Sequence, residues 1–299
     1  MKKVAIYGQS YSVKSEKEIN TLIKTLEKHQ IEFVIEKQFH DLLFANYSID
    51  KTYNTYSSFE DLSSGFDFMF TVGGDGTILR ALTFVRDLNI PILGINTGRL
   101  GFLATVKKDE IEEAVYLLLR GSYSIQERSL LEVSVNPESE EISETNFALN
   151  DVTVARRNTT SMIGVKTYLN EEYLTNFWAD GLIIATPTGS TGYSLSCGGP
   201  VVLPGSKNFI ITPIAPHNLN ARPIIISDTT SIQLEISARE SDFLISLDSR
   251  ITTVPAETLV QIKKASFSIK SVLLENQSYL KTLRGKLLWG EDTRNKSKS

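Results

Sequence analysis

The sequence predicts an α/β N-terminal domain with a mostly parallel sheet, followed by an all-β, sandwich-like C-terminal domain. Over the first 120 residues, short apolar runs alternate with segments of helical periodicity, the pattern of strands joined by helices. From Tyr123 onward, short β-rich stretches separated by turn residues dominate, as in antiparallel sandwiches. We expect one domain at residues 1–122, rejoined by about 275–290, and a second at 123–274. A polar tail at 291–299 is expected to fray.

The first domain should begin with a buried strand, because Val4–Gly8 is a short apolar run that ends at a glycine. Helices are expected where apolar residues recur every three or four positions between charges. In chain order, the expected elements are a strand at 4–8, a helix at 16–29, strands at 31–35 and 66–72, a helix at 77–88, a strand at 90–95 and a helix at 109–119. Residues 46–60 are polar and rich in Tyr and Ser, so we expect an exposed connection there. No motif explains residues 38–60.

The second domain is expected to consist of short strands. They are placed at 130–135, 147–155, 164–169, 182–185, 209–214, 224–226, 231–236 and 243–247. Glu138–Glu141 is expected to be an acidic loop or hairpin tip. A helical pattern returns between Tyr279 and Trp289.

Composition excludes several classes of protein. The formal net charge of −4 over 299 residues argues against a general nucleic-acid binder, which would be basic. Cys197 is the only cysteine, so no internal disulfide and no cysteine-cluster metal site can form. No apolar run approaches the roughly 20 residues of a membrane span, and the N-terminus shows no signal-peptide core. We therefore expect a cytoplasmic protein that binds neither nucleic acid nor membrane.

The sharpest local feature is the turn Gly73-Gly74-Asp75-Gly76-Thr77, between a predicted strand and a predicted helix. Glycines allow close backbone approach to a ligand, and the amides of a helix N-terminus favour a phosphate. A carboxylate repels phosphate, so Asp75 fits better as a base for a hydroxyl or as a partner of ribose hydroxyls. The alternative is that Asp75 is only a helix N-cap. Arg80, one turn later, either counters phosphate charge or is a solvated arginine.

Two common nucleotide-binding fingerprints are missing. The chain has no Gly-x-x-x-x-Gly-Lys-[Ser/Thr] sequence, which excludes the standard phosphate loop of nucleoside triphosphatases. After the first strand stands Gly8-Gln9-Ser10, where a dehydrogenase would have Gly-x-Gly-x-x-Gly.

A second polar cluster lies between Asp180 and Pro200, where an apolar strand ends in nine consecutive residues of Thr, Pro, Gly, Ser and Tyr. Such a loop can offer many donors to a polar ligand, and Tyr193 adds a stacking face for a flat ring. Asn150-Asp151 enters another strand, where Asn can pair with an adenine edge and Asp with ribose hydroxyls. The alternatives are a plain surface loop and an Asx turn.

Together these pieces resemble one enzyme family. The matching motifs, in chain order, are Gly73–Thr77, Asn96–Leu103, Asn150-Asp151, Asp180–Pro200, Pro216–Pro223 and Leu283–Gly290. Gly-Gly-Asp-Gly alone also occurs in phosphofructokinases and lipid kinases, but the combination in this order resembles the NAD kinases from about residue 67 to residue 290. The resemblance implies an N-terminal α/β domain, a β-rich C-terminal domain and a final segment that returns to the first domain.

The resemblance also implies an activity. NAD kinases transfer the γ-phosphoryl of ATP, in some members of polyphosphate, to the 2′-hydroxyl of the adenosine ribose of NAD. Mg²⁺ accompanies the donor, and we expect no metal held by the protein alone. Members commonly form dimers or tetramers, so a homodimer or homotetramer is expected.

Site residues follow from the resemblance position by position. The catalytic base of the family falls on Asp75, which would also contact NAD beside Gly76 and Arg80. Asn150 and Asp151 match the pair at the adenosine portion of NAD. Further NAD-binding positions are Asp180, Thr191, Gly192, Tyr193, Ser194, Leu195, Ser196 and Ala215, and the phosphate side is expected at Gly73, Gly74 and Thr77. Asp248-Ser249-Arg250 stands where many members have an Asp-Gly/Ser-Gln turn, and Arg250 receives no role.

Two other functions stay open from the residues. A lipid or sphingoid kinase shares the Gly-Gly-Asp-Gly turn, but it would need an apolar acceptor cleft, whereas the 180–196 block is polar. A non-catalytic NAD(P) sensor would need no base at Asp75. Phosphorylation of a lipid favours the first, and NAD binding without an ATP-dependent product favours the second.

Overall fold

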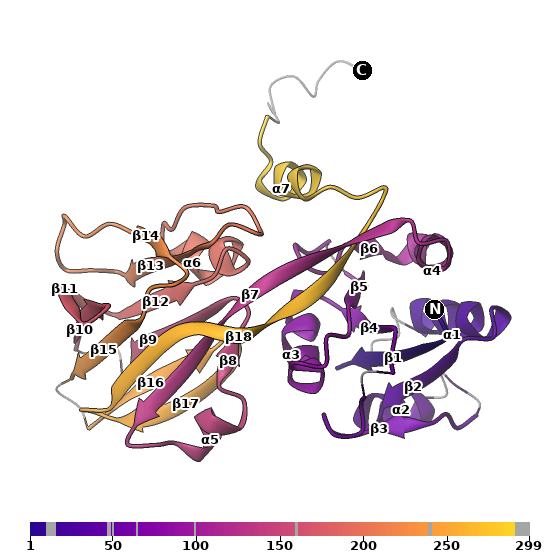
Figure 1. Ribbon diagram of the computed structural model, residues 1–299, viewed down its shortest axis with the longest axis horizontal. Coiled ribbons are helices and arrows are strands. Elements are labelled where there is room, and N and C mark those ends of the chain that lie inside the picture. Colours follow the sequence, from indigo (N-terminus) through magenta and orange to yellow (C-terminus); the bar gives the residue numbers. More distant parts are fainter. Residues whose placement is uncertain are drawn as a thin grey trace. The chain divides into compact units, whose positions relative to one another are not determined.

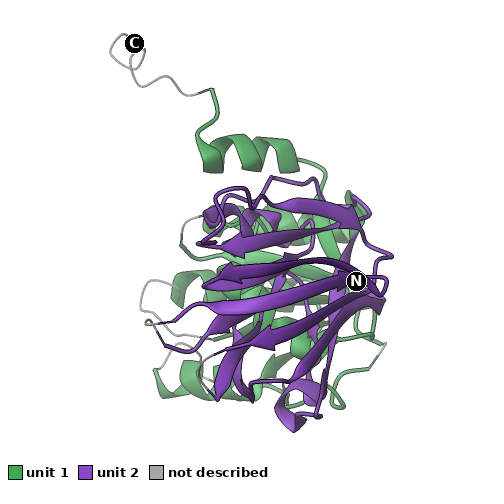
Figure 2. Cartoon of the chain, turned by 90° about the vertical axis from the view of Figure 1, so that its left-hand side faces the viewer, with its two compact units in different colours: residues 1–126, 270–299 green, residues 127–269 purple. Residues whose placement is uncertain are grey.

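The computed structural model describes residues 1–9, 16–46, 49, 51–63, 65–98, 100–158, 161–238 and 241–290. The chain divides into two compact units, residues 1–126 with 270–299 and residues 127–269 (Figures 1 and 2). The tail expected at 291–299 lies outside the described residues.

Unit 1 is built on a parallel sheet with strand order β3-β2-β1-β4-β5, as Figure 1 shows. Its elements are β1 (Lys3–Gly8), α1 (Glu16–Lys28), β2 (Glu32–Glu36), α2 (Lys37–Ala45), β3 (Thr55–Tyr56), β4 (Phe68–Gly73), α3 (Asp75–Val85), β5 (Ile92–Asn96), β6 (Val106–Lys107), η1 (Lys108–Glu110), α4 (Ile111–Leu119) and α7 (Tyr279–Leu287). The predicted α/β class with a mostly parallel sheet is confirmed.

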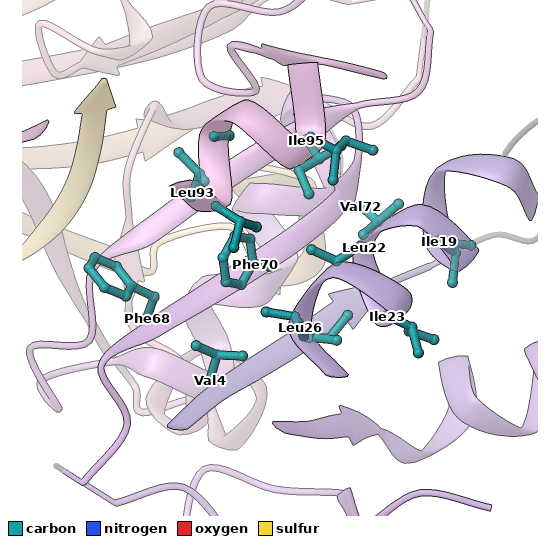
Figure 3. Close-up of a cluster of buried hydrophobic side chains, with 14 of the residues drawn as sticks. Val4, Ile19, Leu22, Ile23, Leu26, Phe68, Phe70, Val72, Leu93 and Ile95 are labelled. Carbon is teal, nitrogen blue, oxygen red and sulfur yellow. The ribbon is translucent and has the colours of Figure 1, made fainter. Parts of the chain in front are cut away.

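The core of unit 1 joins the sheet to α1 (Figure 3). Val4, Phe70 and Leu93 come from three neighbouring strands and are 0% exposed. They meet the apolar face of α1, whose buried residues Ile19, Leu22, Ile23 and Leu26 follow the i, i+3, i+4, i+7 spacing of one helix face. Burial of this face fixes α1 on the sheet.

The expectation of an exposed connection at 46–60 is wrong at Tyr56. Thr55–Tyr56 forms β3, which pairs in parallel with β2, and Tyr56 is only 2% exposed. Its hydroxyl donates to the Ile6 carbonyl at 3.2 Å. The unexplained stretch from residue 38 also contains most of α2, whose first turn is capped by the Glu36 carboxylate on the amides of Gln38 and Phe39. Residues 47, 48 and 50 lie outside the description.

Unit 2 consists mainly of antiparallel strands. Its elements are β7 (Tyr123–Asn136), α5 (Glu140–Glu144), β8 (Phe147–Ala148), β9 (Asp151–Arg156), β10 (Ile163–Leu169), β11 (Glu172–Ala179), β12 (Gly181–Ala185), η2 (Gly189–Thr191), α6 (Tyr193–Ser196), β13 (Asn208–Ile214), β14 (Ile224–Ser227), β15 (Ile232–Ser237), β16 (Asp242–Leu247), β17 (Arg250–Pro255) and β18 (Leu259–Leu274). The long strands β7 and β18 carry residues of both units.

Two antiparallel layers enclose the core of unit 2. One has the order β14-β13-β12-β9-β16-β17, and the other contains β11-β10-β15-β18. Val154, Leu182 and Phe243 of the first layer pack in one buried cluster with Val165 and Leu234 of the second. This arrangement confirms the sandwich-like prediction. The acidic stretch at 138–141 is not wholly a loop, because α5 begins at Glu140. None of the helices in the described part of the chain combines the length and hydropathy needed to cross a membrane.

Truncation of Tyr56 tests the small strand β3. We expect Tyr56→Ala to lower the free energy of unfolding by about 3 kcal/mol or more, because it empties a buried aromatic site. Tyr56→Phe should cost only about 1 kcal/mol, since it loses one hydrogen bond. Urea unfolding measures both values, with Leu280→Ala, at a 57% exposed position, as the control that should stay within about 0.5 kcal/mol. Equal, small effects of all three variants would contradict the buried placement.

Candidate active site

The turn after β4 places Asp75 at the first position of α3. Gly74, not Asp75, is the N-cap, and it has no side chain to cap the helix. The Asp75 carboxylate instead accepts three backbone N–H bonds, from Phe102 at 2.7 Å, Leu103 at 3.0 Å and Ala104 at 2.9 Å. The alternative that Asp75 is only an N-cap is therefore wrong.

The position of the Asp75 carboxylate requires glycine at residue 101. A β-carbon there would lie 1.8 Å from one Asp75 oxygen, inside the radius of any non-bonded contact. At the start of the same segment, the Asn96 side-chain oxygen accepts from the Gly98 amide at 2.8 Å. The backbone of 101–104 is thus shaped around the carboxylate. Sequence analysis missed this role, although the Asn96–Leu103 motif was the signal that could have found it.

The start of α3 is open on one side and packed on the other. Gly74 and Gly76 are exposed, and a β-carbon on either would meet nothing within 4 Å. Thr77 is buried, and a β-carbon on Gly73, whose φ is +156°, would lie 2.1 Å from its hydroxyl oxygen. Gly73 and Thr77 therefore pack together on the buried side of the turn. Gly74 and Gly76 leave the N-terminus of α3 accessible.

Arg80 lies on the exposed side of α3, one turn after the acid. With the Gln9 amide oxygen turned toward it, this oxygen accepts from Arg80 Nε at 2.7 Å and from Nη1 at 3.0 Å. Gln9 follows β1, so two neighbouring strand ends fix the guanidinium. Sequence analysis noted Gln9 only as a departure from the dehydrogenase fingerprint.

In unit 2, the turn Leu149–Asp151 is held from two sides. The Asp248 carboxylate accepts the three amides of Leu149, Asn150 and Asp151 at 3.0, 2.7 and 3.3 Å. The Thr186 hydroxyl donates to the Leu149 carbonyl, and the Thr186 amide donates to the Asn150 carbonyl. The backbone of the turn is thereby satisfied, which leaves the side chains of Asn150 and Asp151 for other partners.

The electrostatics of Asp151 are unusual. It is 6% exposed, and its carboxyl accepts the Thr153 hydroxyl at 3.0 Å. Burial, together with the nearby Asp248 charge, raises the pKa of Asp151 from 3.8 to about 7. Asp151 therefore changes its protonation state near neutral pH.

The segment from Thr191 to Ser196 lies partly beside this turn. A β-carbon on Gly192 would be 3.7 Å from the Asn150 amide nitrogen and 4.0 Å from an Asp151 oxygen, so the backbone at 192 borders the pair. Tyr193 is 48% exposed and offers a ring face. Ser194 is different, because it is 0% exposed and hydrogen-bonds to Thr212 at 2.8 Å. Leu195 is half-buried and Ser196 exposed, both on the short helix α6.

Asp180 and Ala215 lie at the other end of the same sheet. Within β12, Gly181 pairs with Ala155 and Ile214, whereas Ala185 pairs with Asp151. Four residue steps along a strand amount to about 13 Å, so Asp180 and Ala215 are not brought together with Asn150-Asp151. Asp180 is instead paired with Arg156 at 2.8 Å. Ala215 is exposed, with φ +43°.

The turn at 248–250 also explains Arg250. Its Nε donates to the Leu247 carbonyl at 3.3 Å, another of its nitrogens donates to the Phe147 carbonyl, and its guanidinium lies over the Phe147 ring. Arg250 thus ties the Asp248 turn to the strand that precedes Asn150.

Across the described residues there is no group of three or more His, Cys, Asp or Glu side chains that could hold a metal ion.

The raised pKa of Asp151 predicts how stability depends on pH. The folded state holds a proton on this carboxyl that the unfolded state has already lost, so its contribution to stability falls as pH rises toward 7. Between pH 5 and pH 8 we expect the free energy of unfolding to fall by about 2 kcal/mol through this group. Asp151→Asn should remove that part of the fall in urea titrations, whereas Asp242→Asn should keep it. An unchanged fall in Asp151→Asn would contradict the assignment.

Comparisons with known proteins identify the family of the chain. Residues 4–123 match the family model of the ATP-NAD kinase N-terminal domain, and residues 149–274 match that of the ATP-NAD kinase C-terminal domain. Curated NAD kinases of Christiangramia forsetii and Flavobacterium psychrophilum are 52% and 53% identical to this chain, over 98% of it and 100% of each relative.

Two solved structures share the fold. An NAD kinase from Archaeoglobus fulgidus in complex with ATP aligns with a TM-score of 0.74 and 26% identity, over 96% of this chain and 98% of that one. A yeast NADH kinase complexed with NADH aligns with a TM-score of 0.85 and 21% identity, over 99% and 89%. With both family models and full-length relatives matched, the chain belongs to the NAD kinase family of phosphotransferases.

Proposed function

We propose that this chain is an ATP-dependent NAD kinase in which Asp75 is the general base. The acceptor is the 2′-hydroxyl of the adenosine ribose of NAD, and the product is NADP. The observation that carries the proposal is the carboxylate of Asp75, fixed by three backbone amides beside an accessible helix N-terminus. A base and an anion site at one turn are what phosphoryl transfer to a hydroxyl requires.

The chemistry assigned to Asp75 is a proton transfer. As the bond forms between the ribose 2′-oxygen and the γ-phosphorus, the bond from that phosphorus to the β,γ-bridging oxygen of ATP breaks and ADP leaves. The hydroxyl proton passes to Asp75. A carboxylate offers about four lone-pair positions, and three here accept amides. One position is left for the hydroxyl, and its direction is set by the three bonds already made.

Positioning of the phosphoryl group is assigned to the start of α3. A helix N-terminus attracts an anion through its free amides and its dipole. Gly74 and Gly76 allow a phosphate to approach this backbone closely, while Gly73 and Thr77 shape the turn beneath. Arg80, oriented by Gln9, adds a positive charge that offsets the repulsion between Asp75 and phosphate oxygens.

Recognition of NAD is assigned chiefly to unit 2. Asn150 would pair with the adenine edge and Asp151 with ribose hydroxyls, bordered by Gly192 and the ring of Tyr193. The remaining predicted contacts are Thr191, Leu195, Ser196, Asp180 and Ala215. Ser194, being buried against Thr212, serves by holding this segment in place.

Mg²⁺ is proposed to enter as part of the ATP substrate. The described residues offer no acidic or histidine cluster that would hold the ion alone. A magnesium ion bound by phosphate oxygens keeps most of its waters and needs few protein ligands. ATP is the preferred donor in this proposal, with polyphosphate as the alternative to be assayed.

We also propose that the chain acts in the cytoplasm, where ATP and NAD are available, and that it forms a homodimer or homotetramer through unit 2. Trp178 on β11 is 51% exposed, and its carbonyl accepts the His217 amide at 2.8 Å, next to Leu219, which is 86% exposed. Apolar side chains so exposed favour a subunit contact. Light scattering of the purified chain measures the mass directly, and a monomer would contradict this part.

Replacement of Asp75 tests the base. With NAD, ATP and Mg²⁺ supplied, we expect Asp75→Asn to lower kcat for NADP⁺ formation by about 10²–10⁴-fold, because the hydroxyl proton loses its acceptor. NADP⁺ is read with an NADP-specific dehydrogenase, and NAD affinity by calorimetry. Affinity should change only a few-fold.

The matched control is Asp87→Asn, an exposed acid just beyond α3, which should keep wild-type turnover. Near wild-type turnover of Asp75→Asn would exclude Asp75 as the base. Phosphorylation of a lipid but not of NAD by the wild-type chain would favour the lipid kinase, and NAD binding without any product would favour the sensor.

Removal of divalent metal tests the role given to Mg²⁺. Excess EDTA should abolish NADP⁺ formation and leave NAD affinity unchanged, because the ion enters with ATP and not with the protein. Added Mg²⁺ should restore the rate in full. Retention of activity after exhaustive EDTA treatment and desalting would contradict this arrangement.

A further inference from the structure

Asp248 lies beside the Asn150-Asp151 turn without a role in the proposed chemistry. It follows β16 in the tight turn to β17, with φ +55°, a conformation that Asp tolerates better than most residues. Its own amide donates to the Asp151 carbonyl at 2.9 Å, while one of its carboxylate oxygens accepts the Asp151 amide. The two aspartates are therefore joined by a reciprocal pair of hydrogen bonds.

We propose that Asp248 is a positioning residue for NAD: its carboxylate fixes the Leu149–Asp151 turn and so aims the side chains of Asn150 and Asp151 at the adenosine portion of NAD. This inference rests on the proposed function, because it takes Asn150 and Asp151 as NAD contacts. A carboxylate that gathers three successive amides fixes the backbone more firmly than one neutral acceptor could.

The surroundings of Asp248 are built to hold it in place. The Ser246 hydroxyl donates to the Asp248 carbonyl at 2.9 Å, and Arg250 binds the carbonyls of Leu247 and Phe147 on either side. Burial raises the pKa of Asp248, whereas the amides that it accepts and the Arg250 charge act in the opposite direction and favour its ionised form. On the opposite side of the turn, Thr186 binds the carbonyls of Leu149 and Asn150. Together these contacts restrain the backbone of the Leu149–Asp151 turn.

Asp248 also acts on Asp151 through charge. Its negative charge disfavours ionisation of Asp151 and contributes to the raised pKa of that carboxyl. The Thr153 hydroxyl also acts on Asp151, and the Arg250 guanidinium acts on Asp248. The Asp151 charge in turn contributes to the raised pKa of Tyr193 and of Cys197 in the segment that borders the turn. An ionised Asp151 accepts ribose hydroxyls better than a protonated one. NAD affinity should then improve as pH rises through about 7.

The test is the kinetics of Asp248→Asn as a function of pH. The amide keeps the shape and one acceptor oxygen but loses the charge. We expect KM for NAD to rise about tenfold or more, with KM for ATP and kcat within about threefold of wild type. The pH at which KM for NAD falls should move down, because the repelling charge is gone. A purely structural role would not move this midpoint in that direction.

Asp242→Asn is the matched control, because Asp242 begins the same strand β16 and pairs with Arg157 far from the turn. It should keep the KM for NAD and the pH midpoint of wild type. A folded Asp248→Asn with both quantities unchanged would overturn the proposal. The proposed function would stand in that case, whereas a wild-type chain that makes no NADP⁺ would instead overturn the proposed function.

A measurement on the wild-type chain keeps the proposal testable if Asp248→Asn does not fold. Carbon-13 NMR of the aspartate carboxyls follows Asp151 and Asp248 during a pH titration with and without saturating NAD. We expect the two to titrate as a coupled pair, and NAD to shift the Asp151 midpoint downward because it binds the ionised form. Resonances that titrate independently and do not respond to NAD would overturn the proposal.

Discussion

The backbone contacts that hold the Asp75 carboxylate are the constraint on which the proposed function of unit 1 depends. Three consecutive amides from residues 102–104 end on one carboxylate, and Gly101 leaves the space that the carboxylate occupies. The parallel sheet brings this about, because β4 and β5 are neighbours and the loops that leave their carboxyl ends meet at one edge. A reactive group held in this way has its geometry set before any substrate binds, which is how preorganised sites save reorganisation during reaction.

In unit 2, the Asn150-Asp151 turn is held by the same kind of contact between a carboxylate and backbone amides. There too a carboxylate, that of Asp248, gathers three successive amides and frees the adjoining side chains for a ligand. The difference lies in the surroundings. Asp151 is deeply buried beside a second acid, which places its titration near neutral pH. One turn thereby holds the acid that we propose as the base, and the other holds an acid whose charge responds to pH.

Periodicity predicted most of the fold because the elements concerned are strongly amphipathic or wholly apolar. The face of α1, the almost wholly buried β1 and β4, and the fully buried β12 are examples. The strands β11, β17 and β18 were missed because polar residues such as Glu172, Thr252 and Lys263 interrupt their apolar alternation. Tyr56 was missed for a related reason, since a two-residue strand has no period and its burial depends on residues 50 positions away.

The site could be predicted as a set of residues but not as an arrangement. Motif order placed Asp75 and Asn150-Asp151 on strand ends, where the structure has them. It could not reveal Gly101, Gln9 or Asp248, since each acts through contacts that link distant segments. It also could not separate Ser194, which is buried, from Tyr193 beside it, or reveal that Asp180 lies at the far end of β12 from Asp151.

A crystal structure of the chain with NAD bound tests the central claim most directly. The account predicts that the 2′-hydroxyl oxygen of the adenosine ribose lies about 2.6–3.2 Å from an Asp75 oxygen, with the three amide bonds from Phe102, Leu103 and Ala104 retained. A complex in which this hydroxyl lies beyond hydrogen-bond reach of Asp75, or contacts another acid instead, would contradict it.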